Sequence, residues 1–391
     1  MRIVDVCGFY ASQGGGVRTY VDRKLRAVSR FGHELIVVVP GERDELTQVA
    51  DGSYILSIAS PLFPLDPRYR YFASEARLHA ELDDLSPDLV ECGTPWTSAA
   101  MVARWRGGAR RVLIMHLDVF ATYPYRWFGD VMDVKAIDRG FEWFWRHLRR
   151  LGEAFDMVVC ANHELGRRTA EGGVPNVVVE PMGVEPGCFD PALRDAGFRA
   201  QMLKACGLGS DATLLLGVGR HSPEKRWPMI VEAVTAAGYH HDIALQIIGE
   251  GRDRPRIERA IAGNPHIRLF EPTRDRPMLA KLMASSDALV HGSESESFGM
   301  VGAEARASGL PVIVPDRGGM SDQAGNGMGW TYRSGDGSAL TAMLRDVIGG
   351  GKLADVRLRS SAHAHDVRTM DEHFAQLFSR YCGLTSHSLA A

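Results

Sequence analysis

Short apolar runs alternate with longer amphipathic stretches along almost the whole chain, and this alternation limits the fold more than any other feature. In the first half the runs are often β-branched and are bounded by Gly, Pro or Asp, which is typical of buried strands. They are Ile3–Val6, Leu35–Val39, Leu89–Glu91, Val112–Met115 and Met157–Cys160. The stretches between them favour helices, for example over 16–31, 70–85 and 136–154. Strands that alternate with helices predict a parallel sheet covered on both faces.

The second half repeats the pattern, with a linker before it. Its predicted strands are Leu214–Val218, Ala244–Ile248, Ile267–Leu269, Ala288–His291 and Val312–Val314, with helices over 227–237, 254–262, 278–285 and 301–308. Gly and Pro gather in Met182–Pro191, a composition that suits a linker. We therefore predict two doubly wound α/β domains, residues 1–188 and 189–370, facing each other across a cleft at the carboxyl ends of their strands. A last helix, within about 371–391, is expected to pack back on the first domain.

Charge and cysteine usage narrow the class of protein. The formal net charge of −3 argues against wholesale binding of nucleic acid. The six cysteines are scattered and form no C-x-x-C pair, which suits reduced cytoplasmic thiols better than disulfides or a zinc site. No signal-peptide pattern opens the chain, and no segment reaches the roughly 18 apolar residues of a membrane-spanning helix. We expect a cytoplasmic protein with at most peripheral contact with the inner face of the membrane.

The segment from Glu296 to Glu304, with the sequence ESFGMVGAE, carries the strongest functional signal. It indicates a loop that opens a helix, so that the amides of Phe298, Gly299 and Met300 would lie at a helix amino terminus and bind anions or hydroxyl groups. Glu296 precedes the turn and can accept hydrogen bonds from sugar hydroxyls, and Glu304, two turns later, can reach another part of an elongated ligand. Taken singly, Glu296 could be a capping acid and Glu304 an exposed helix residue. The whole string points to a ligand site.

The turn from Gly217 to Lys225, with the sequence GVGRHSPEK, carries the second signal. A predicted strand ends there, and the cations Arg220 and Lys225 follow it. A planar guanidinium and a compact ammonium hold phosphate oxygens in complementary ways, and fixed cations stabilise the charge that gathers on a diphosphate leaving group. The alternative is a solvated basic turn.

Two weaker signals follow strands of the first half. Gly14, Gly15 and Gly16 would let the backbone approach a diphosphate or a sugar, although a flexible turn explains them as well. His116 and Asp118 follow the strand that ends at Met115. His116 could bind a sugar or guide a proton, or be structural, and Asp118 could instead cap the next segment.

A basic and aromatic pattern marks the predicted helix over 136–154. Arg139, Trp143, Arg146 and Arg150 follow one another at spacings of 4, 3 and 4 residues, away from the apolar side. With the aromatic and basic residues of 68–72, this side could meet an anionic lipid or polyprenyl-phosphate surface. A solvated basic side of a helix is the alternative.

Together these strings resemble the retaining glycosyltransferases of the GT-B fold and family 4 type, almost from end to end. Residues 218–225 are similar to that family's phosphate-binding turn, and 296–304 to its Glu-x7-Glu element. The departures are Arg226 where a glycine commonly follows the lysine, His291-Gly292 in place of a common Pro-Ser, and Met182 where an asparagine is often found.

The resemblance implies an acceptor domain, 1–188, and a nucleotide-sugar domain, 189–370. Its implied site residues are Glu296, Phe298, Gly299 and Met300 on the donor sugar, Glu304 on the ribose, Arg220 and Lys225 on the diphosphate with Gly15 and Gly16 closing over it, and His116 with Asp118 at the sugar pocket. It implies a hexosyltransferase that keeps the anomeric configuration and needs neither metal nor cofactor beyond the nucleotide sugar. A UDP-sugar is favoured, with a GDP-sugar next, and the acceptor would be a glycan, a lipid or a small molecule.

Other functions stay open at this point. A nucleotide-sugar epimerase or hydrolase could share the donor site and lack an acceptor, and a catalytically silent protein could bind the nucleotide sugar alone. A nicotinamide dehydrogenase is disfavoured because the first strand lacks the G-x-G-x-x-G fingerprint.

Overall fold

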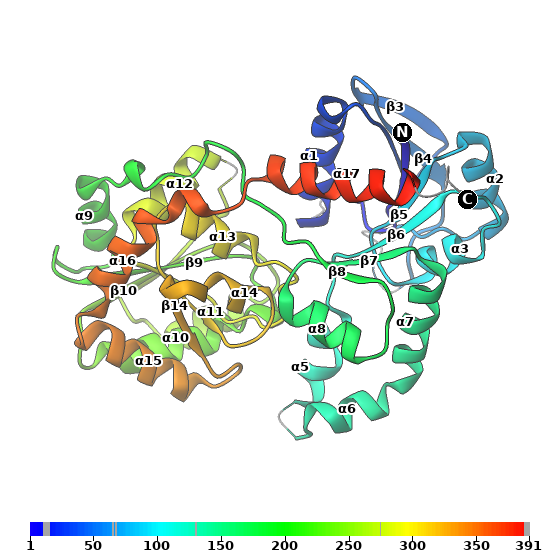
Figure 1. Ribbon diagram of the computed structural model, residues 1–391. Helices are drawn as coiled ribbons and strands as arrows, with labels where there is room; N and C mark the ends of the chain where they lie inside the picture. The colour runs from blue at the N-terminus through cyan, green and yellow to red at the C-terminus, as the bar shows by residue number, and fades with distance from the viewer. Residues whose placement is uncertain (11–15, 65, 67–68, 130, 274, 387–391) are drawn as a thin grey trace. The chain divides into compact units, whose positions relative to one another are not determined.

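The computed structural model of the chain describes residues 1–391 with the exception of 11–15, 65, 67–68, 130, 274 and 387–391. It divides into two compact units (Figure 1). Unit 1 comprises Met1–Pro181 with Asp371–Ala391, and unit 2 comprises Met182–Met370. Both are α/β units built on largely parallel sheets, so the predicted fold class is confirmed.

Unit 1 is built on one sheet with the strand order β3-β4-β2-β1-β5-β6-β7-β8. Its strands are β1 (Arg2–Val6), β2 (Glu34–Gly41), β3 (Glu45–Ala50), β4 (Ser53–Ala59), β5 (Leu89–Cys92), β6 (Arg110–Met115), β7 (Met157–Cys160) and β8 (Val177–Val179). Every neighbouring pair is parallel except β3 with β4. The β3–β4 hairpin has no counterpart among the predicted strands, because β3 is exposed along almost its whole length and lacks an apolar run.

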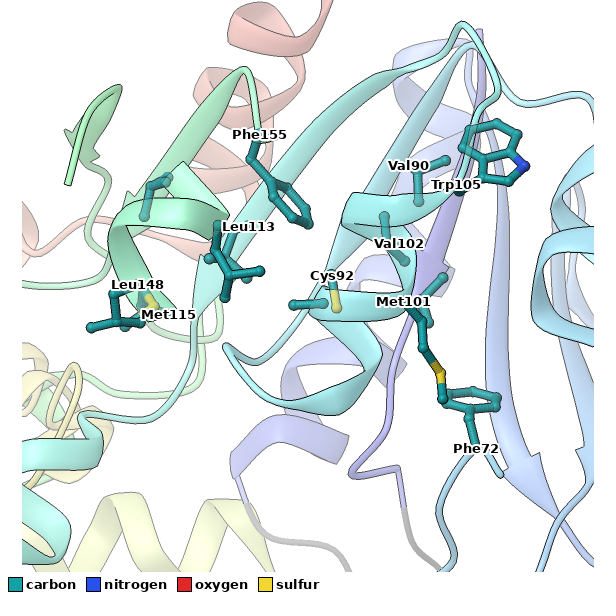
Figure 2. Packing of buried hydrophobic residues seen from close by; sticks show 14 of the residues in the cluster. Phe72, Val90, Cys92, Met101, Val102, Trp105, Leu113, Met115, Leu148 and Phe155 are labelled. Carbon is teal, nitrogen blue, oxygen red and sulfur yellow. The ribbon is translucent and has the colours of Figure 1, made fainter. Parts of the chain in front are cut away.

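The helices of unit 1 close over a core of aliphatic, sulfur and aromatic side chains. They are α1 (Gly16–Ala27), α2 (Glu75–Leu85), α3 (Thr97–Arg104), α4 (Val119–Thr122), α5 (Pro124–Phe128), α6 (Val134–Gly140), α7 (Glu142–Ala154), α8 (His163–Glu171) and α17 (Met370–Ser386). Figure 2 shows Val102 and Trp105 of the α3 region beside Val90 and Cys92 of β5. Burying such side chains supplies most of the free energy that holds helices on a sheet.

The single helix predicted over 136–154 is wrong, because the chain forms two helices there. α6 ends at Gly140, and Phe141 has the non-helical dihedral angles φ −106° and ψ 23°. Glycine is a poor helix former, so the break falls where continuing the helix is least favourable. The apolar side still packs inward, since Phe144, Trp145, Leu148 and Leu151 of α7 are buried.

The last helix, α17, belongs to unit 1 although the chain reaches it from unit 2. Phe374 packs against Tyr20 of α1, and Phe378 packs against Phe31 (Figure 1, red helix beside α1). The hydroxyl of Tyr381 donates to Glu91 of β5 at 2.6 Å. The end of the chain therefore completes the core of the first unit.

Unit 2 has the strand order β11-β10-β9-β12-β13-β14, with every pair parallel. Its strands are β9 (Thr213–Val218), β10 (Ile243–Ile248), β11 (Ile267–Phe270), β12 (Ala288–Val290), β13 (Val312–Pro315) and β14 (Gly329–Tyr332). Its helices are α9 (Ala196–Ala205), α10 (Trp227–Gly238), α11 (Arg254–Ile261), α12 (Arg276–Ser285), α13 (Met300–Ala307), α14 (Gly319–Gln323), α15 (Gly337–Gly349) and α16 (Lys352–Ala362). Counted within the unit this order is 3-2-1-4-5-6, the doubly wound order of nucleotide-binding sheets.

Two segments at the ends of unit 2 pair with each other. Val184 and Thr369 form a parallel bridge, supported by hydrogen bonds from Val184 to Arg368 and from Met370 to Val184. A Cβ atom on Gly183 would lie 2.1 Å from the carbonyl group of Thr369, so only glycine fits there.

Candidate functional site

The strand order of unit 2 places its candidate site between β9 and β12. From β9 the chain turns toward β10, whereas from β12 it turns toward β13, so the two connections leave in opposite directions. Ligands of doubly wound sheets bind at this point, outside the carboxyl ends of the strands. Lys225 lies on the connection that follows β9, and Glu296 on the connection that follows β12.

Lys225 and Glu296 meet in an ion pair. The Lys225 ammonium donates to Oε1 of Glu296 and lies 3.4 Å from Nε2 of His291. His291 is fully buried, and its Nδ1 accepts a hydrogen bond from the Ser293 amide at 3.2 Å. In the neutral ring the proton is therefore on Nε2, which points toward the ion pair. The sequence did not predict His291 as a site residue.

The charges at this point shift two pKa values. Burial and then the charge of Lys225 lower the pKa of His291 to about 3. Burial acts to raise the pKa of Glu296, but the nearby positive charges, that of Lys225 first, and the hydrogen bond from Lys225 together outweigh it and lower that pKa to about 2. At neutral pH the site therefore holds an ammonium, a carboxylate and an uncharged imidazole.

The two arginines near Lys225 behave differently. The side chain of Arg220 is 71% exposed and lies 3.3 Å from Glu224, so it can turn to an anionic ligand at little cost. Arg226 has φ 51°, in the left-handed region that favours glycine, and its guanidinium pairs with Glu294 at 2.5 Å. Arg226 stands where the resembling family commonly has glycine. Here the arginine side chain forms an ion pair with Glu294.

The loop after Glu296 opens α13 as the sequence predicts. Gly299 precedes the helix with φ 79°, and a Cβ atom there would lie 2.7 Å from the sulfur of Met320. Phe298 is buried, and Met300 is the first residue of the helix. The first amides of a helix have no partner within it, so this terminus can donate to an anion or a hydroxyl group.

Glu304 is buried and pairs with a residue that the sequence did not predict. Its Oε1 accepts from Arg276 at 2.6 Å, and Arg276 also lies over the ring of Phe189. Burial acts to lower the pKa of Arg276, but the charge of Glu304 raises it. Arg276 is the first residue of α12, where a positive charge is unfavourable because it opposes the helix dipole. A cation at that position could have indicated from the sequence that Arg276 has an acidic partner elsewhere in the chain.

In unit 1, His116 follows β6 and is buried against Tyr20, with ring centroids 4.8 Å apart. A Cβ atom on Gly93 would lie 3.1 Å from the His116 ring, so the turn after β5 lies close to it. Tyr20 also bonds His373 of α17 through its hydroxyl at 3.1 Å. Burial lowers the pKa of His116 to about 4, so the ring is uncharged at neutral pH.

Asp118 is engaged within unit 1. Its Oδ1 accepts from the amide of Ala121 and caps α4, and its Oδ2 pairs with Arg168. This geometry supports the capping alternative over contact with a ligand. Gly16 begins α1 with open space around it, whereas Gly15 lies outside the described residues.

The sequence analysis also did not predict a fully buried lysine in unit 1, Lys24. The ammonium of Lys24 lies 2.5 Å from Glu91 and 3.3 Å from Asp5. Burial raises the pKa of Asp5 to about 7, although Lys24 opposes the shift. Acids within strands that are covered on both faces need a buried cation, and the acids in β1 and β5 could have signalled it.

The described part of the chain contains no cluster of three or more His, Cys, Asp or Glu side chains that could hold a metal ion. None of its helices is long and apolar enough to cross a membrane. An open hollow lined by Met1, Arg2, His33 and Glu34 lies at the amino ends of β1 and β2, away from His116.

The two buried histidines predict a loss of stability in acid. His116 and His291 stay uncharged in the folded chain but would titrate near pH 6.5 when unfolded. Below that pH the unfolded chain binds protons that the folded chain does not. The free energy of unfolding should therefore fall by up to about 1.4 kcal/mol per pH unit for each histidine, down to its folded pKa.

Urea denaturation between neutral and mildly acidic pH measures this slope. We expect a shallower slope in His116→Gln and in His291→Gln, and no change in His365→Gln, which alters an exposed histidine. Slopes in the first two variants equal to that of the unsubstituted protein would contradict the prediction.

Comparison with protein families covers nearly the whole chain in two parts. Residues 14–187 match the model described as Glycosyltransferase Family 4, and residues 199–361 match the model described as Glycosyl transferases group 1. The chain is 31% identical over 321 residues to a GDP-mannose-dependent alpha-(1-6)-phosphatidylinositol dimannoside mannosyltransferase of Mycobacterium tuberculosis, covering 80% of this chain and 79% of that one. It is 30% identical over 331 residues to a GDP-mannose-dependent alpha-mannosyltransferase of the same species, covering 82% and 81%.

Solved structures show the same fold at lower identity. Sucrose-phosphate synthase from Thermosynechococcus elongatus superposes with a TM-score of 0.76 at 17% identity, covering 99% of this chain and 100% of that one. A glycosyltransferase from Rickettsia africae superposes with a TM-score of 0.69 at 18% identity, covering 98% and 97%. The fold of the two units is that of the GT-B glycosyltransferases.

Proposed function

The chain belongs to the group 1 glycosyltransferases of the family 4 type, and on that premise we propose that it transfers a mannosyl residue from GDP-mannose to a hydroxyl group of a lipid or lipid-linked glycan. The observation that carries the proposal is the partly buried Lys225–Glu296 pair at the switch point of the unit 2 sheet. The pair supplies a cation for a diphosphate and a carboxylate for sugar hydroxyls at the place where such sheets bind nucleotides.

Guanosine and mannose are supported by the two relatives described above, whose names both state GDP-mannose dependence. The sequence alone favoured uridine as the commoner base of the resembling family. We give the relatives more weight, because they share about 30% identity over four fifths of the chain.

In the proposed reaction the bond between the sugar carbon and the diphosphate breaks while the acceptor oxygen bonds to the same face of that carbon. Lys225, with Arg220 turning inward, stabilises the negative charge that develops on the departing diphosphate. The diphosphate takes the proton of the acceptor hydroxyl, and the anomeric configuration is retained. The two cations take the role that a divalent metal has in other transferases, so we propose that no metal is required.

Glu296 and the amides at the start of α13 would hold the donor sugar. Because Glu296 stays ionised, it accepts hydrogen bonds from two sugar hydroxyls without competing for a proton. Glu304 would accept from the ribose hydroxyls, with Arg276 fixing its orientation. In unit 1, His116 is uncharged at neutral pH and would act there as a hydrogen-bonding group.

A thermal-shift panel of GDP, UDP and ADP, with and without EDTA, tests the donor. We expect GDP to raise the Tm by several degrees, because a ligand at 100 times its Kd adds about 2.7 kcal/mol to the stability of the folded state. Chelation should leave the shift intact. Glu304→Gln should shrink it, since the ribose and Arg276 both lose an anionic partner. Glu258→Gln, which alters an exposed pair with Arg254, serves as the matched control and should behave as wild type.

Each other outcome assigns a different function. A shift from UDP alone would replace GDP-mannose by a UDP-sugar, and a shift lost with EDTA would overturn metal independence. Release of free mannose at the same rate with and without acceptor would identify a hydrolase. Binding without any turnover in a panel of lipid and glycan acceptors would identify a silent binder.

A further inference from the structure

Large apolar side chains lie exposed on the α5–α7 segment of unit 1. Trp127 and Trp143 are each 57% exposed, and Val131 is 80% exposed. Phe128 and Met132 are also exposed, and the ring of Phe128 lies 6.2 Å from that of Phe141, at the junction of α6 and α7. Isolated exposed apolar residues are ordinary, but several large ones on neighbouring helices mark an interaction surface.

Cations border these apolar side chains. On α7, Arg146 and Arg150 follow Trp143 at spacings of three and four residues, so all three share one side of the helix. Phe144, Leu148 and Leu151 lie on the other side and are buried. Arg139 is exposed at the end of α6, just before Trp143.

The carboxylates that the structure describes nearby are mostly engaged elsewhere. Asp133 caps α6, Asp138 accepts from the hydroxyl of Tyr125 at 2.6 Å, and Glu142 pairs with Arg149. Within the described ranges no carboxylate lies within ion-pair distance of Arg139, Arg146 or Arg150, and Glu153, three residues after Arg150, is exposed. The guanidinium groups therefore remain available to an outside anion.

We propose that this surface, defined by Trp127, Val131, Arg139, Trp143 and Arg146, docks the enzyme on an anionic lipid bilayer. Tryptophan prefers the boundary between headgroups and acyl chains, and arginine next to it binds the negative headgroups. Figure 1 shows α5, α6 and α7 next to one another in unit 1. The proposal deepens the proposed function, since a lipid acceptor would be met in the plane of the membrane.

Two residues of the segment 68–72, which the sequence grouped with this surface, are engaged elsewhere. Arg70 donates to the carbonyl of Ser60 at 2.6 Å, and Phe72 is buried in the core of unit 1. Arg68 lies outside the described residues.

Co-sedimentation of the full chain with vesicles tests the surface. The vesicles are phosphatidylcholine alone, or phosphatidylcholine with about one third phosphatidylglycerol. We expect binding to the anionic vesicles that weakens at about 0.5 M salt. Trp127→Ser with Trp143→Ser, and separately Arg139→Ser with Arg146→Ser, should each lower the partition coefficient by about tenfold or more.

The matched control replaces equally exposed apolar residues of unit 2, Tyr239→Ser with Leu358→Ser, which are 83% and 75% exposed. It should leave vesicle binding unchanged, and all variants should keep the wild-type Tm and its shift with GDP. Equal binding by the tryptophan variant and wild type would overturn the proposal, as would a change from dimer to monomer in that variant without vesicle binding. If vesicle binding depends on the surface but no mannosyl transfer occurs, the proposed function fails and the docking surface stands.

Discussion

Replacing Lys225 by alanine is expected to lower kcat/KM for the proposed mannosyl transfer by about 10²–10³-fold, because the departing diphosphate loses a fixed, partly buried cation. The substitution also leaves Glu296 beside an uncharged His291, so the pKa of Glu296 rises from about 2 and its hold on the sugar hydroxyls weakens. Steady-state kinetics with GDP-mannose, together with calorimetric titration of GDP, measure both effects.

Three further variants separate these causes. Lys225→Arg keeps the charge and should recover part of the activity. Lys225→Ala with Glu296→Gln removes the uncompensated carboxylate, so recovery there would mean that Lys225 serves Glu296 rather than the diphosphate. Lys352→Ala removes an exposed lysine paired with Asp346 and should have no effect. Wild-type affinity for GDP in Lys225→Ala would exclude the proposed diphosphate contact.

Replacing Lys24 by methionine is expected to destabilise the protein by about 3–5 kcal/mol, the largest loss of stability that the structure predicts. Lys24 is fully buried between Asp5 and Glu91, and removing its charge leaves two carboxylates close together in the core of unit 1. Tyr381 bonds the same Glu91, so the loss should loosen α17 as well. Calorimetry of the variant and of wild type measures the difference.

The effect should depend on pH in a defined direction. The pKa of Asp5 is already raised to about 7 with Lys24 present, and it rises further without it. A carboxyl group with a raised pKa binds more protons in the folded state, so the destabilisation should shrink as the pH falls from 8 toward 5. Lys352→Met, at an exposed pair, should cost less than about 0.5 kcal/mol at every pH. A loss under about 1 kcal/mol for Lys24→Met would contradict a structural role for the ion cluster.

Much of the candidate site follows from the sequence because parallel strands end at one edge of a sheet. The motifs containing Lys225, Glu296 and His116 each follow a predicted strand, so the alternation of strands and helices already assigns them to carboxyl ends. The amino terminus of α13 is equally local, since Gly299 and the residues after it carry the pattern within one turn.

The pairing of these residues with others does not follow from the sequence. Arg276 meets Glu304 across 28 residues, Lys24 meets Glu91 across 67, and Tyr20 meets His373 across 353. No local periodicity encodes such partners, because each contact depends on how neighbouring strands and helices are ordered in space. Asp118 is a predicted site residue whose partner likewise could not be read from the sequence. Its ion pair with Arg168 depends on the packing of α8 beside it.

By itself the sequence determined the two doubly wound units, the position of most strands and helices, and the resemblance to a glycosyltransferase family. These features depend on hydrophobic periodicity and on motifs of neighbouring residues, which a linear pattern records. Tertiary structure alone decided which buried charges compensate one another, as Lys24 does with Glu91 and Arg276 with Glu304. Those outcomes depend on burial, and burial sets both the cost of a charge and the identity of the side chain that offsets it.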